Sequence, residues 1–557
     1  MFRLAIIGVM CSLTLVEVSI GLHSEREYHH RKNRLAQSFS SFEIPAQELN
    51  SEHWLNLGQQ ILGEKLNFQH IPTKAKNVIF FIGDGMSSQT IAATRMYLGN
   101  ENEYLSFEKF PHLGLAKTYC VNRQVPDSSC SGTSYLSGVK INYGMVNLVA
   151  SIPRYTCEYQ KSNETEIDGL MKWAQEAGKG TGIVTTTRVT HATPAASYAH
   201  SANRYWEGDF EVDEACPSGE KPLDIAQQMV YNKVSQNFNV ILGGGRKYFL
   251  PKEMVDEDGE SGYRDDRKNL IEEWKEIHSD MGSYSYVWDK PGLKVVDYEN
   301  TSHLLGLFAS SHLLYNLEAH EQNRTDVEPS LAEMTEAAIK MLEKNPSGYV
   351  LFVEGGHIDM AHHETWTRLG LDETAELSKA VEVARQLTSM EDTLIIVSAD
   401  HGHTMTYNGY PKRGQDVLGI ADTSDMDGLP YTTLSYANGP GYIDTYKTEN
   451  RAERVDISEV EFTSIHHIYP ATALMDAEAH GGEDVCVYAS GPLSNIFIGS
   501  YEQHTIPHLI AYAAAIGEYA EPSDPTDDED GSGHRLMSSL LCLLVAISVG
   551  FFNHCHS

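Results

Sequence analysis

The chain has 557 residues, of which 41% are hydrophobic and 21% charged, enough for one large α/β domain or two to three ordinary ones. Its 77 acidic residues outnumber its 42 lysines and arginines, which gives a formal net charge of −35. So acidic a surface disfavours nucleic acid and acidic membrane surfaces, and no nucleic-acid binding is expected.

The first 21 residues predict a secretory signal peptide. Arg3 precedes an apolar run, and small residues lie near Gly21. The run is too short for a stable membrane span. Residues 22–44 are polar and basic and are expected to form a flexible segment. Sequons, which predict N-glycosylation of an exported chain, lie at Asn163, Asn300 and Asn323.

An amphipathic helix is predicted next, at residues 45–67, followed by alternating strands and helices. The predicted strands are 77–83, 181–187, 239–245, 349–355, 393–400 and 485–490, and the helices include 167–178, 222–232, 329–345 and 371–388. Strands that are apolar throughout indicate a sheet buried on both faces. The predicted fold class is therefore α/β, with a largely parallel central sheet covered by helices on both faces.

Residues 407–478 interrupt this alternation. They are rich in Gly, Pro, Tyr and Asp, and we expect an inserted subdomain with little regular core.

Between the two end segments lie the cysteines Cys120, Cys130, Cys157, Cys216 and Cys486. An oxidising compartment permits two disulfides and one free thiol among them. We expect Cys120–Cys130 and Cys157–Cys216 to pair, although the sequence alone allows other pairings. Cys486 lies in the apolar run "DVCVYA" and is expected to be free and buried.

The C-terminal end combines a polar segment with an apolar one. Residues 519–535 form an acidic linker, and residues 536–557 carry the run "LMSSLLCLLVAISVGFF". This order is typical of a glycosylphosphatidylinositol (GPI) attachment signal, with Asp530, Gly531 or Ser532 as candidate anchor sites. The polar spacer is shorter than the usual ~8–12 residues, so a single C-terminal membrane helix remains an alternative. Both alternatives place the body of the protein on the extracellular side of the plasma membrane.

Predicted strands end in acidic residues at three places. Asp84, Glu354 and Asp400 stand at these ends, and His401 follows Asp400. In parallel sheets ligands bind at the carboxyl ends of the strands. One acid after a strand is more often a helix cap, but three acids with an adjacent histidine favour a shared metal cluster.

The stretch "VEGGHIDMAHHE" at 353–364 adds further donors. Asp359 and His363 are four residues apart, so both can face one side of a helical turn. His362 is not excluded by this spacing, and His480 stands just before the last predicted strand. Nitrogen and oxygen donors without cysteine suit zinc together with magnesium.

Two more segments have residue types that suit phosphate chemistry. Ser128, after "VPD", is predicted to begin a helix, where a serine is usually a cap but can be a nucleophile beside N–H groups that favour phosphate. No Gly-x-Ser-x-Gly motif surrounds it, which favours activation by a metal. His191, Thr193 and Arg204 lie in "VTHATPAASYAHSANRYW". Beside a metal cluster, Arg204 becomes a candidate bidentate phosphate clamp rather than a surface salt-bridge residue.

Together these motifs resemble the animal-type alkaline phosphatases, from about residue 48 to residue 518. The resemblance is carried by "GDGM", "VPDS", "THATPA", "NRYW", "ILGGGRKY", "EGGHIDMAHHE", "ADHGH" and "AHGGEDV". It implies an alkaline phosphatase domain over 45–518, with a crown-like insertion at about 407–478. It also implies a phosphate-monoester hydrolase of broad specificity with an alkaline optimum.

The resemblance implies two Zn²⁺ and one Mg²⁺, held by residues that match the family's ligands. The first zinc would be held by Asp359, His363 and His480. The second would be held by Asp84, Asp400 and His401, with Ser128 as fourth ligand. Magnesium would be held by Asp84, Thr193 and Glu354. Ser128 would be the nucleophile of a phosphoserine intermediate and Arg204 the phosphate clamp, with His191 beside the ligands; His357 and Met360 have no role as ligands.

Two further expectations come from the resemblance. Tyr410 could reach the active site of a partner subunit and the 45–67 helix could embrace that partner, so a homodimer is expected. Vertebrate relatives hold a calcium-like fourth ion partly through an acid after a Phe, but here Ala309 follows Phe308. Glu328 and Asp258 could still align there, so we expect a weak or vacant calcium site.

Two alternatives differ in function. One is a related metal hydrolase acting on phosphodiesters or sulfates, which would lack the magnesium ligands and the Arg204 motif. The other is a catalytically inactive surface receptor, which would have lost at least one ligand, whereas none is missing here.

Overall fold

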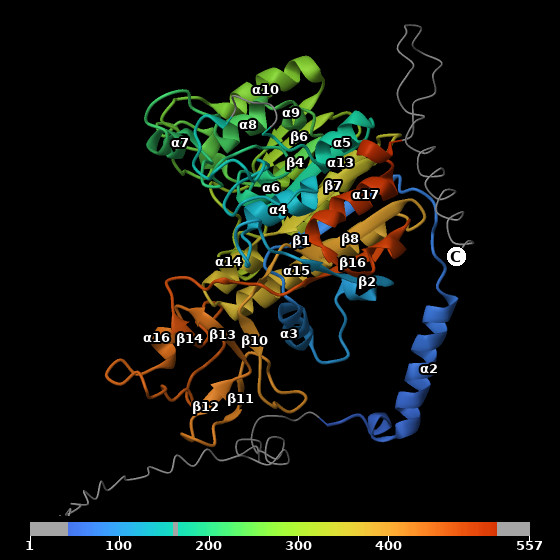
Figure 1. The fold of residues 1–557 in the computed structure, drawn as a ribbon, viewed down its shortest axis with the longest axis vertical. Helices are drawn as coiled ribbons and strands as arrows, with labels where there is room; N and C mark the ends of the chain where they lie inside the picture. Colours follow the sequence, from blue (N-terminus) through green and yellow to red (C-terminus); the bar gives the residue numbers. More distant parts are fainter. Residues whose placement is uncertain (1–42, 160–164, 521–557) are drawn as a thin grey trace, which may run out of the picture.

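A ten-stranded sheet forms the centre of the structure, a computed structural model that describes residues 43–159 and 165–520 (Figure 1). Its strands are β1 (Asn77–Gly83), β2 (His112–Lys117), β3 (Gly180–Arg188), β4 (Val240–Gly244), β5 (Tyr284–Val287), β6 (His303–Leu307), β7 (Tyr349–Gly355), β8 (Thr393–Ala399), β16 (Val485–Ser490) and β17 (Gly499–Glu502). Their order is β17-β2-β16-β8-β1-β7-β3-β4-β6-β5. Of these ten, only β16 runs antiparallel to its neighbours. The predicted, largely parallel α/β sheet is confirmed.

Helices cover both faces of this sheet. On one face α13 (Leu331–Leu342) and α15 (Thr367–Leu387) pack over β3, β7 and β1. On the other, α4 (Ser128–Ser137), α5 (Leu170–Glu176) and α17 (Ile506–Ala514) pack together, with α5 over β3 and β7. The remaining helices are α2 (Ser51–Asn67), α3 (Ser88–Leu98), α6 (Ala192–Ala195), α7 (Asp209–Ala215), α8 (Ile225–Tyr231), α9 (Lys233–Gln236), α10 (Leu270–Met281), α11 (Lys290–Lys294), α12 (Asn316–Glu321), α14 (His357–His363) and α16 (Tyr442–Thr445). No helix in the described part of the chain is long and apolar enough to cross a membrane.

The predicted strands and helices all occur, but four strands of the sheet were not predicted. In β2, buried and exposed residues alternate, so it lacks the continuous apolar run that marks a central strand. The strands β5 and β17 are only four residues long and mostly not buried. These three strands lie at or near a sheet edge, where a strand with one face in water carries a weaker signal. The fourth, β6, is buried throughout but is only five residues long.

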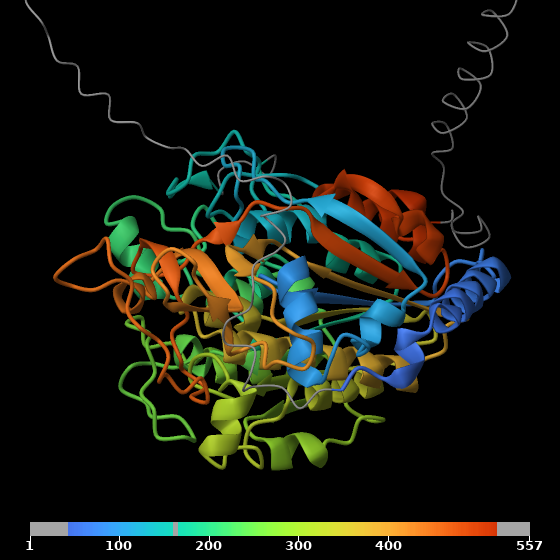
Figure 2. The same cartoon turned by 90° about the horizontal axis from the view of Figure 1, so that it is seen from below.

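The predicted amphipathic helix at 45–67 is α2, preceded by a 3-10 turn at Ala46–Leu49. It begins where the Asn50 side chain accepts a hydrogen bond from Glu52 N at 2.9 Å. None of its residues is buried, and Leu55 is 65% exposed. It lies at the periphery of the body in both views (Figures 1 and 2). The helix therefore gains little from packing on its own chain.

The segment 407–478 has more internal order than the sequence analysis expects. A three-stranded sheet combines β10 (Met405–Tyr407), β13 (Leu434–Gly439) and β14 (Ala471–Leu474), and β11 (Ile420–Thr423) pairs with β12 (Pro430–Thr432). Leu434, Tyr436 and Tyr469 are fully buried in its small core. The expectation of little core is wrong because these apolar residues are spread among turn residues and show no period.

Both expected disulfides, Cys120–Cys130 and Cys157–Cys216, are present. Cys486 is free, as expected, but half-buried rather than buried. It lies opposite Leu115 of β2, itself 41% exposed, on a face of the sheet that reaches solvent.

Several predictions concern residues outside the described ranges. These are the signal peptide at 1–21, nearly all of 22–44, Asn163, most of the acidic linker at 519–535, the anchor candidates Asp530, Gly531 and Ser532, and the apolar tail at 536–557. Asn300 and Asn323 are exposed, as glycosylation requires.

Candidate active site

Three buried acids meet at the carboxyl ends of β1, β7 and β8. Gly83 pairs with Gly355 on one side and with Ala399 on the other, which places Asp84, Glu354 and Asp400 side by side. All three are fully buried. Burial raises the pKa of Asp84 well above its usual range, and the neighbouring carboxylates add to this. Burial also raises the pKa of Glu354 to about 7. Carboxylates so crowded and desolvated need cations beside them to remain ionised.

The first cluster of donors forms around Ser128, the first residue of α4. Its Oγ lies 3.5 Å from Asp84 Oδ1 and 3.4 Å from His401 Nε2. His401 Nε2 lies 3.1 Å from Asp400 Oδ2, and the donor atoms of Asp84, Asp400 and His401 are mutually within 4.8 Å. The helix is capped by Asp127, which accepts from Cys130 N. The side chain of Ser128 therefore faces the acids, which favours a nucleophile over a cap.

The second cluster combines α14 with β15 (His480–Gly481). His363 Nε2 and His480 Nε2 are 3.1 Å apart, and they lie 3.4 Å and 3.3 Å from Asp359 Oδ1. Each ring's Nδ1 faces a backbone carbonyl, that of Glu478 for His363 and that of Pro126 for His480. The proton therefore belongs on Nδ1, which leaves both Nε2 lone pairs directed at one point. A divalent metal fits this point.

Two residues of this cluster were missed by the sequence analysis. His403 Nε2 lies 2.8 Å from Asp359 Oδ1, and its Nδ1 contacts the Glu478 carboxylate. Although burial opposes it, Glu478 and Asp359 raise the pKa of His403 to about 10. His403 therefore orients Asp359 rather than offering a lone pair. The spacing in "HGH" and "EAH" was a signal that could have indicated both residues, because each lies two positions from a predicted ligand.

A third cluster surrounds Glu354. Thr185 and Thr187 donate to its Oε2, whereas its buried Oε1 has no hydrogen-bond partner. Thr193 Oγ1 donates to Asp84 Oδ2 at 3.3 Å. An orphaned buried carboxylate oxygen beside a second carboxylate fits a hard cation such as magnesium.

His191 lies closer to this third cluster than expected. One of its ring nitrogens and the carboxylate oxygens of Asp84 and Glu354 are within 4.8 Å of one another. Its Nε2 accepts from Arg204 at 3.2 Å, and its Nδ1 is buried without a partner. By distance alone, His191 is thus as eligible a ligand as Thr193.

Arg204 is held in one orientation. It donates from Nη1 to Asp127 Oδ2 at 3.0 Å, and the Asp127 carboxylate also accepts from Gly144 N at 2.9 Å. The Arg204 side chain is only 12% exposed. Its partner is therefore a buried acid next to the nucleophile and not a surface residue, as a clamp requires.

The structure excludes His362 as a ligand. Its Nε2 contacts Thr90 Oγ1 at 3.0 Å and its Nδ1 contacts Tyr436 OH at 2.9 Å, so both ring nitrogens are engaged. It joins α14 to the inserted segment instead.

The residues considered for a fourth metal do come together, but with an arginine between them. Arg324 Nη2 donates to Asp258 Oδ1 at 3.1 Å and to Glu328 Oε1 at 3.2 Å. Arg246 also pairs with Asp258. The methyl group of Ala309, after the buried Phe308, supplies no oxygen.

We predict that Glu478→Ala weakens metal binding by at least about tenfold, as loss of a residue that orients ligands does elsewhere. The variant would free His403 and Asp359 and leave the second cluster less ordered. Metal content after dialysis against a graded chelator measures this. Glu364→Ala, an exposed neighbour of His363, should match the wild type; equal metal loss in both variants would contradict the role of Glu478.

Comparisons with known proteins agree with this geometry. A family model described as alkaline phosphatase matches residues 75–516. The chain is 42% identical to the membrane-bound alkaline phosphatase of Bombyx mori, over 89% of this chain and 91% of that protein. It is 42% identical to the tissue-nonspecific isozyme of Homo sapiens, over 85% and 90%. The solved alkaline phosphatase of Thermus thermophilus shares the fold, with a TM-score of 0.56 at 23% identity over 82% of this chain and 94% of that one. The chain belongs to the alkaline phosphatase family and is a phosphatase.

Proposed function

We propose that this phosphatase is a broad phosphate-monoester hydrolase with an alkaline optimum, working through a phosphoserine at a site for two zinc ions and one magnesium ion. The observation that carries the proposal is the position of Ser128 Oγ, within 3.5 Å of both Asp84 and His401. A serine hydroxyl between metal-ligand side chains is poised to become a nucleophile.

The three clusters would hold the three ions. Asp359, His363 and His480 suit the first zinc, Asp84, Asp400, His401 and Ser128 the second, and Asp84, Glu354 and Thr193 magnesium. The bound ions would supply positive charge to the attacking and leaving oxygens and lower the pKa of the Ser128 hydroxyl.

The chain's own residues then account for the rest of the reaction. Ser128 Oγ forms a bond to phosphorus while the bond from phosphorus to the ester oxygen breaks, and the alcohol leaves with a proton. Water next attacks the phosphoserine, which releases phosphate and restores Ser128. Arg204, fixed by Asp127, binds two phosphate oxygens in both steps.

The third cluster and Arg204 favour a monoesterase over an enzyme for diesters or sulfates. Arg204 suits a phosphoryl group with several free oxygens, and a diester has fewer free oxygens than a monoester. We therefore expect hydrolysis of an aryl phosphate monoester in preference to the matching diester and sulfate, and loss of this activity with a chelator.

Ser128→Ala should lower turnover of the aryl monoester by at least about a thousandfold, because the covalent step is removed. Steady-state kinetics at saturating metal measures the loss. Ser88→Ala, an exposed serine at the start of α3, serves as control. Retention of more than about a tenth of the wild-type rate would contradict the assignment of the nucleophile.

For the fourth metal we propose that Arg324 takes the place of calcium. Its guanidinium neutralises Asp258 and Glu328, and the remaining Glu328 oxygen accepts from Leu314 N at 2.9 Å. Calcium needs about six to eight oxygen ligands, and here the carboxylates are already paired.

Calcium should therefore raise the melting temperature of the metal-replete wild type by less than ~1 °C. Arg324→Ala should lower it by ~2 °C, because two carboxylates lose their shared cation, and millimolar calcium should restore part of this. Arg267→Ala, an exposed arginine 3.9 Å from its partner acid, is the control. Stabilisation of the wild type by micromolar calcium, abolished by Glu328→Gln, would show a functional calcium site.

We propose a homodimer, with α2 of each subunit covering its partner. The support is the absence of any buried residue in α2, whose apolar side chains include Trp54, Leu55 and Leu62. Tyr410, 57% exposed in the inserted segment, would approach the partner's active site.

We also propose that the enzyme is anchored at the cell surface by a lipid near residues 530–532. The support is the sequence of the tail and the likeness to a membrane-bound relative. A phosphatidylinositol-specific phospholipase should release the activity from membranes into the soluble fraction. Heat-inactivated phospholipase is the control, and activity that stays with the membrane after complete digestion would favour a retained helix.

A further inference from the structure

A group of arginines and tyrosines borders Arg204 on the outside. We call it the rim cluster: Arg123, Tyr143, Arg154, Tyr155 and Tyr205. The Arg154 guanidinium lies over three rings, 5.8 Å from the centroid of Tyr143, 4.9 Å from Tyr155 and 5.7 Å from Tyr205. The guanidinium of Arg204 lies 5.7 Å from the same Tyr205 ring. The rim cluster is therefore continuous with the proposed phosphate clamp.

The chain links the rim cluster to the second cluster as well, where the leaving group would depart. Arg123 lies in the short stretch that ends at Pro126 and Asp127. Pro126 O accepts from His480 Nδ1 at 2.8 Å, and Asp127 binds Arg204. This stretch thus connects a predicted metal ligand with the clamp, and Arg123 precedes Pro126 and Asp127 by three and four positions.

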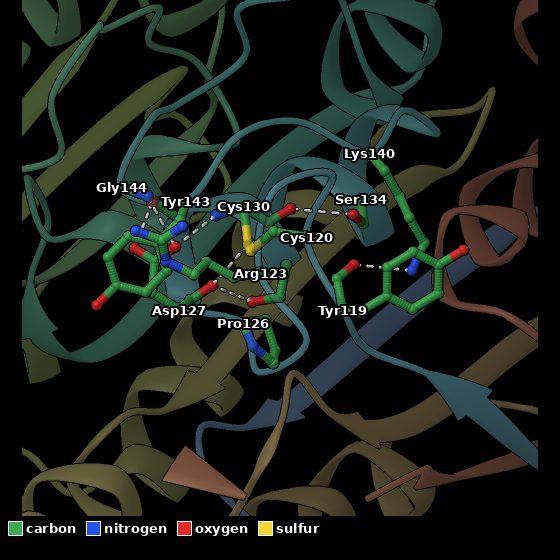
Figure 3. Close-up of a disulfide and its surroundings, with 12 residues drawn as sticks. Tyr119, Cys120, Arg123, Pro126, Asp127, Cys130, Ser134, Lys140, Tyr143 and Gly144 are labelled. Carbon is green, nitrogen blue, oxygen red and sulfur yellow. Dashed lines mark hydrogen bonds between the residues drawn. A yellow bond between two sulfur atoms is a disulfide. The ribbon is translucent and has the colours of Figure 1, made fainter. Parts of the chain in front are cut away.

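The stretch that carries Arg123 is well ordered. The Cys120–Cys130 disulfide closes it, and Cys120 and Arg123 exchange backbone hydrogen bonds (Figure 3). The Arg123 guanidinium lies 6.0 Å from the Tyr143 ring, and Gly144 N, next in the chain, donates to Asp127. A site held in this way before binding loses less conformational entropy when a ligand arrives.

The two rim arginines lack acidic partners among the residues that the structure describes. Arg154 donates only to the neutral Asn203 Oδ1, at 2.7 and 3.2 Å, and Arg123 to the carbonyl of Asn122. In a chain with a net charge of −35, positive charge left unpaired beside an anion-binding arginine is unusual. The tyrosines Tyr143, Tyr155 and Tyr205 are 36%, 56% and 59% exposed, so part of each side chain reaches solvent beside the arginines.

We propose that the rim cluster is a subsite for the leaving group, and that it favours nucleoside diphosphates among phosphate esters. Arg123 and Arg154 would bind the second phosphate, and a tyrosine ring would stack on the base. Attack by Ser128 Oγ on the terminal phosphorus breaks its bond to the bridging oxygen, which leaves with the nucleoside monophosphate. Water then releases the phosphoryl group from Ser128 as inorganic phosphate. The inference rests on the proposed phosphomonoesterase activity and adds a substrate preference to it.

The test compares adenosine diphosphate with glycerol phosphate, whose leaving group is neutral. In Arg123→Gln/Arg154→Gln, the ratio of kcat/KM for the diphosphate to kcat/KM for glycerol phosphate should fall about tenfold, mostly through KM for the diphosphate. Added salt should lower this ratio in the wild type and have little effect in the variant. Arg451→Gln is the matched control, because Arg451 also lies over a tyrosine, 5.5 Å from the ring of Tyr442, but in the inserted segment.

Tyr205→Leu separates stacking from charge. It should lower kcat/KM about threefold for adenosine diphosphate and leave pyrophosphate, which has no base, nearly unchanged. The subsite would be overturned if the double arginine variant kept the wild-type ratio, that is, if kcat/KM fell equally for adenosine diphosphate and glycerol phosphate. If the wild type hydrolysed neither adenosine diphosphate nor glycerol phosphate, the proposed function itself would be overturned.

Discussion

The mutual repulsion of buried carboxylates at the carboxyl ends of β1, β7 and β8 is the constraint on which the site depends. Asp84, Glu354 and Asp400 are fully buried at the ends of three neighbouring strands. Removing such groups from water costs several kcal/mol or more each unless a counter-charge is near. The rest of the site would provide that counter-charge, as bound cations, together with the side chains that hold the cations in place.

Hydrogen bonds behind the proposed ligands decide which atoms face the cations. Backbone carbonyls take the Nδ1 protons of His363 and His480, and Glu478 holds His403 against Asp359. The inserted segment thus contributes more than a covering surface. Its last residue, Glu478, sets the tautomer of His363 through its carbonyl and holds His403 through its carboxylate, whereas Pro126 sets the tautomer of His480.

The sequence was sufficient for the central strands and for the residues around Ser128, and insufficient where order depends on distant contacts. Asp84, Glu354 and Asp400 could be found because each ends a continuous apolar run. Tyr436 could not, since its burial depends on Thr367 and His362 from another part of the chain. Arg324 was missed for a similar reason: only the fold shows that it lies between Asp258 and Glu328.

The solvent exposure of α2 has a consequence for how the helix is maintained. Isolated helices shorter than ~12–15 residues are marginal in water, and α2, at 17 residues, is not much longer and buries none of them on its own chain. In the proposed dimer, the surface of the partner would stabilise this helix, so its helical population should rise with the local concentration of the protein. Molecules confined to a two-dimensional layer meet far more often than molecules diluted in a volume. Crowding at a surface would thereby promote the folding of α2, while the folding of the central sheet would not depend on it.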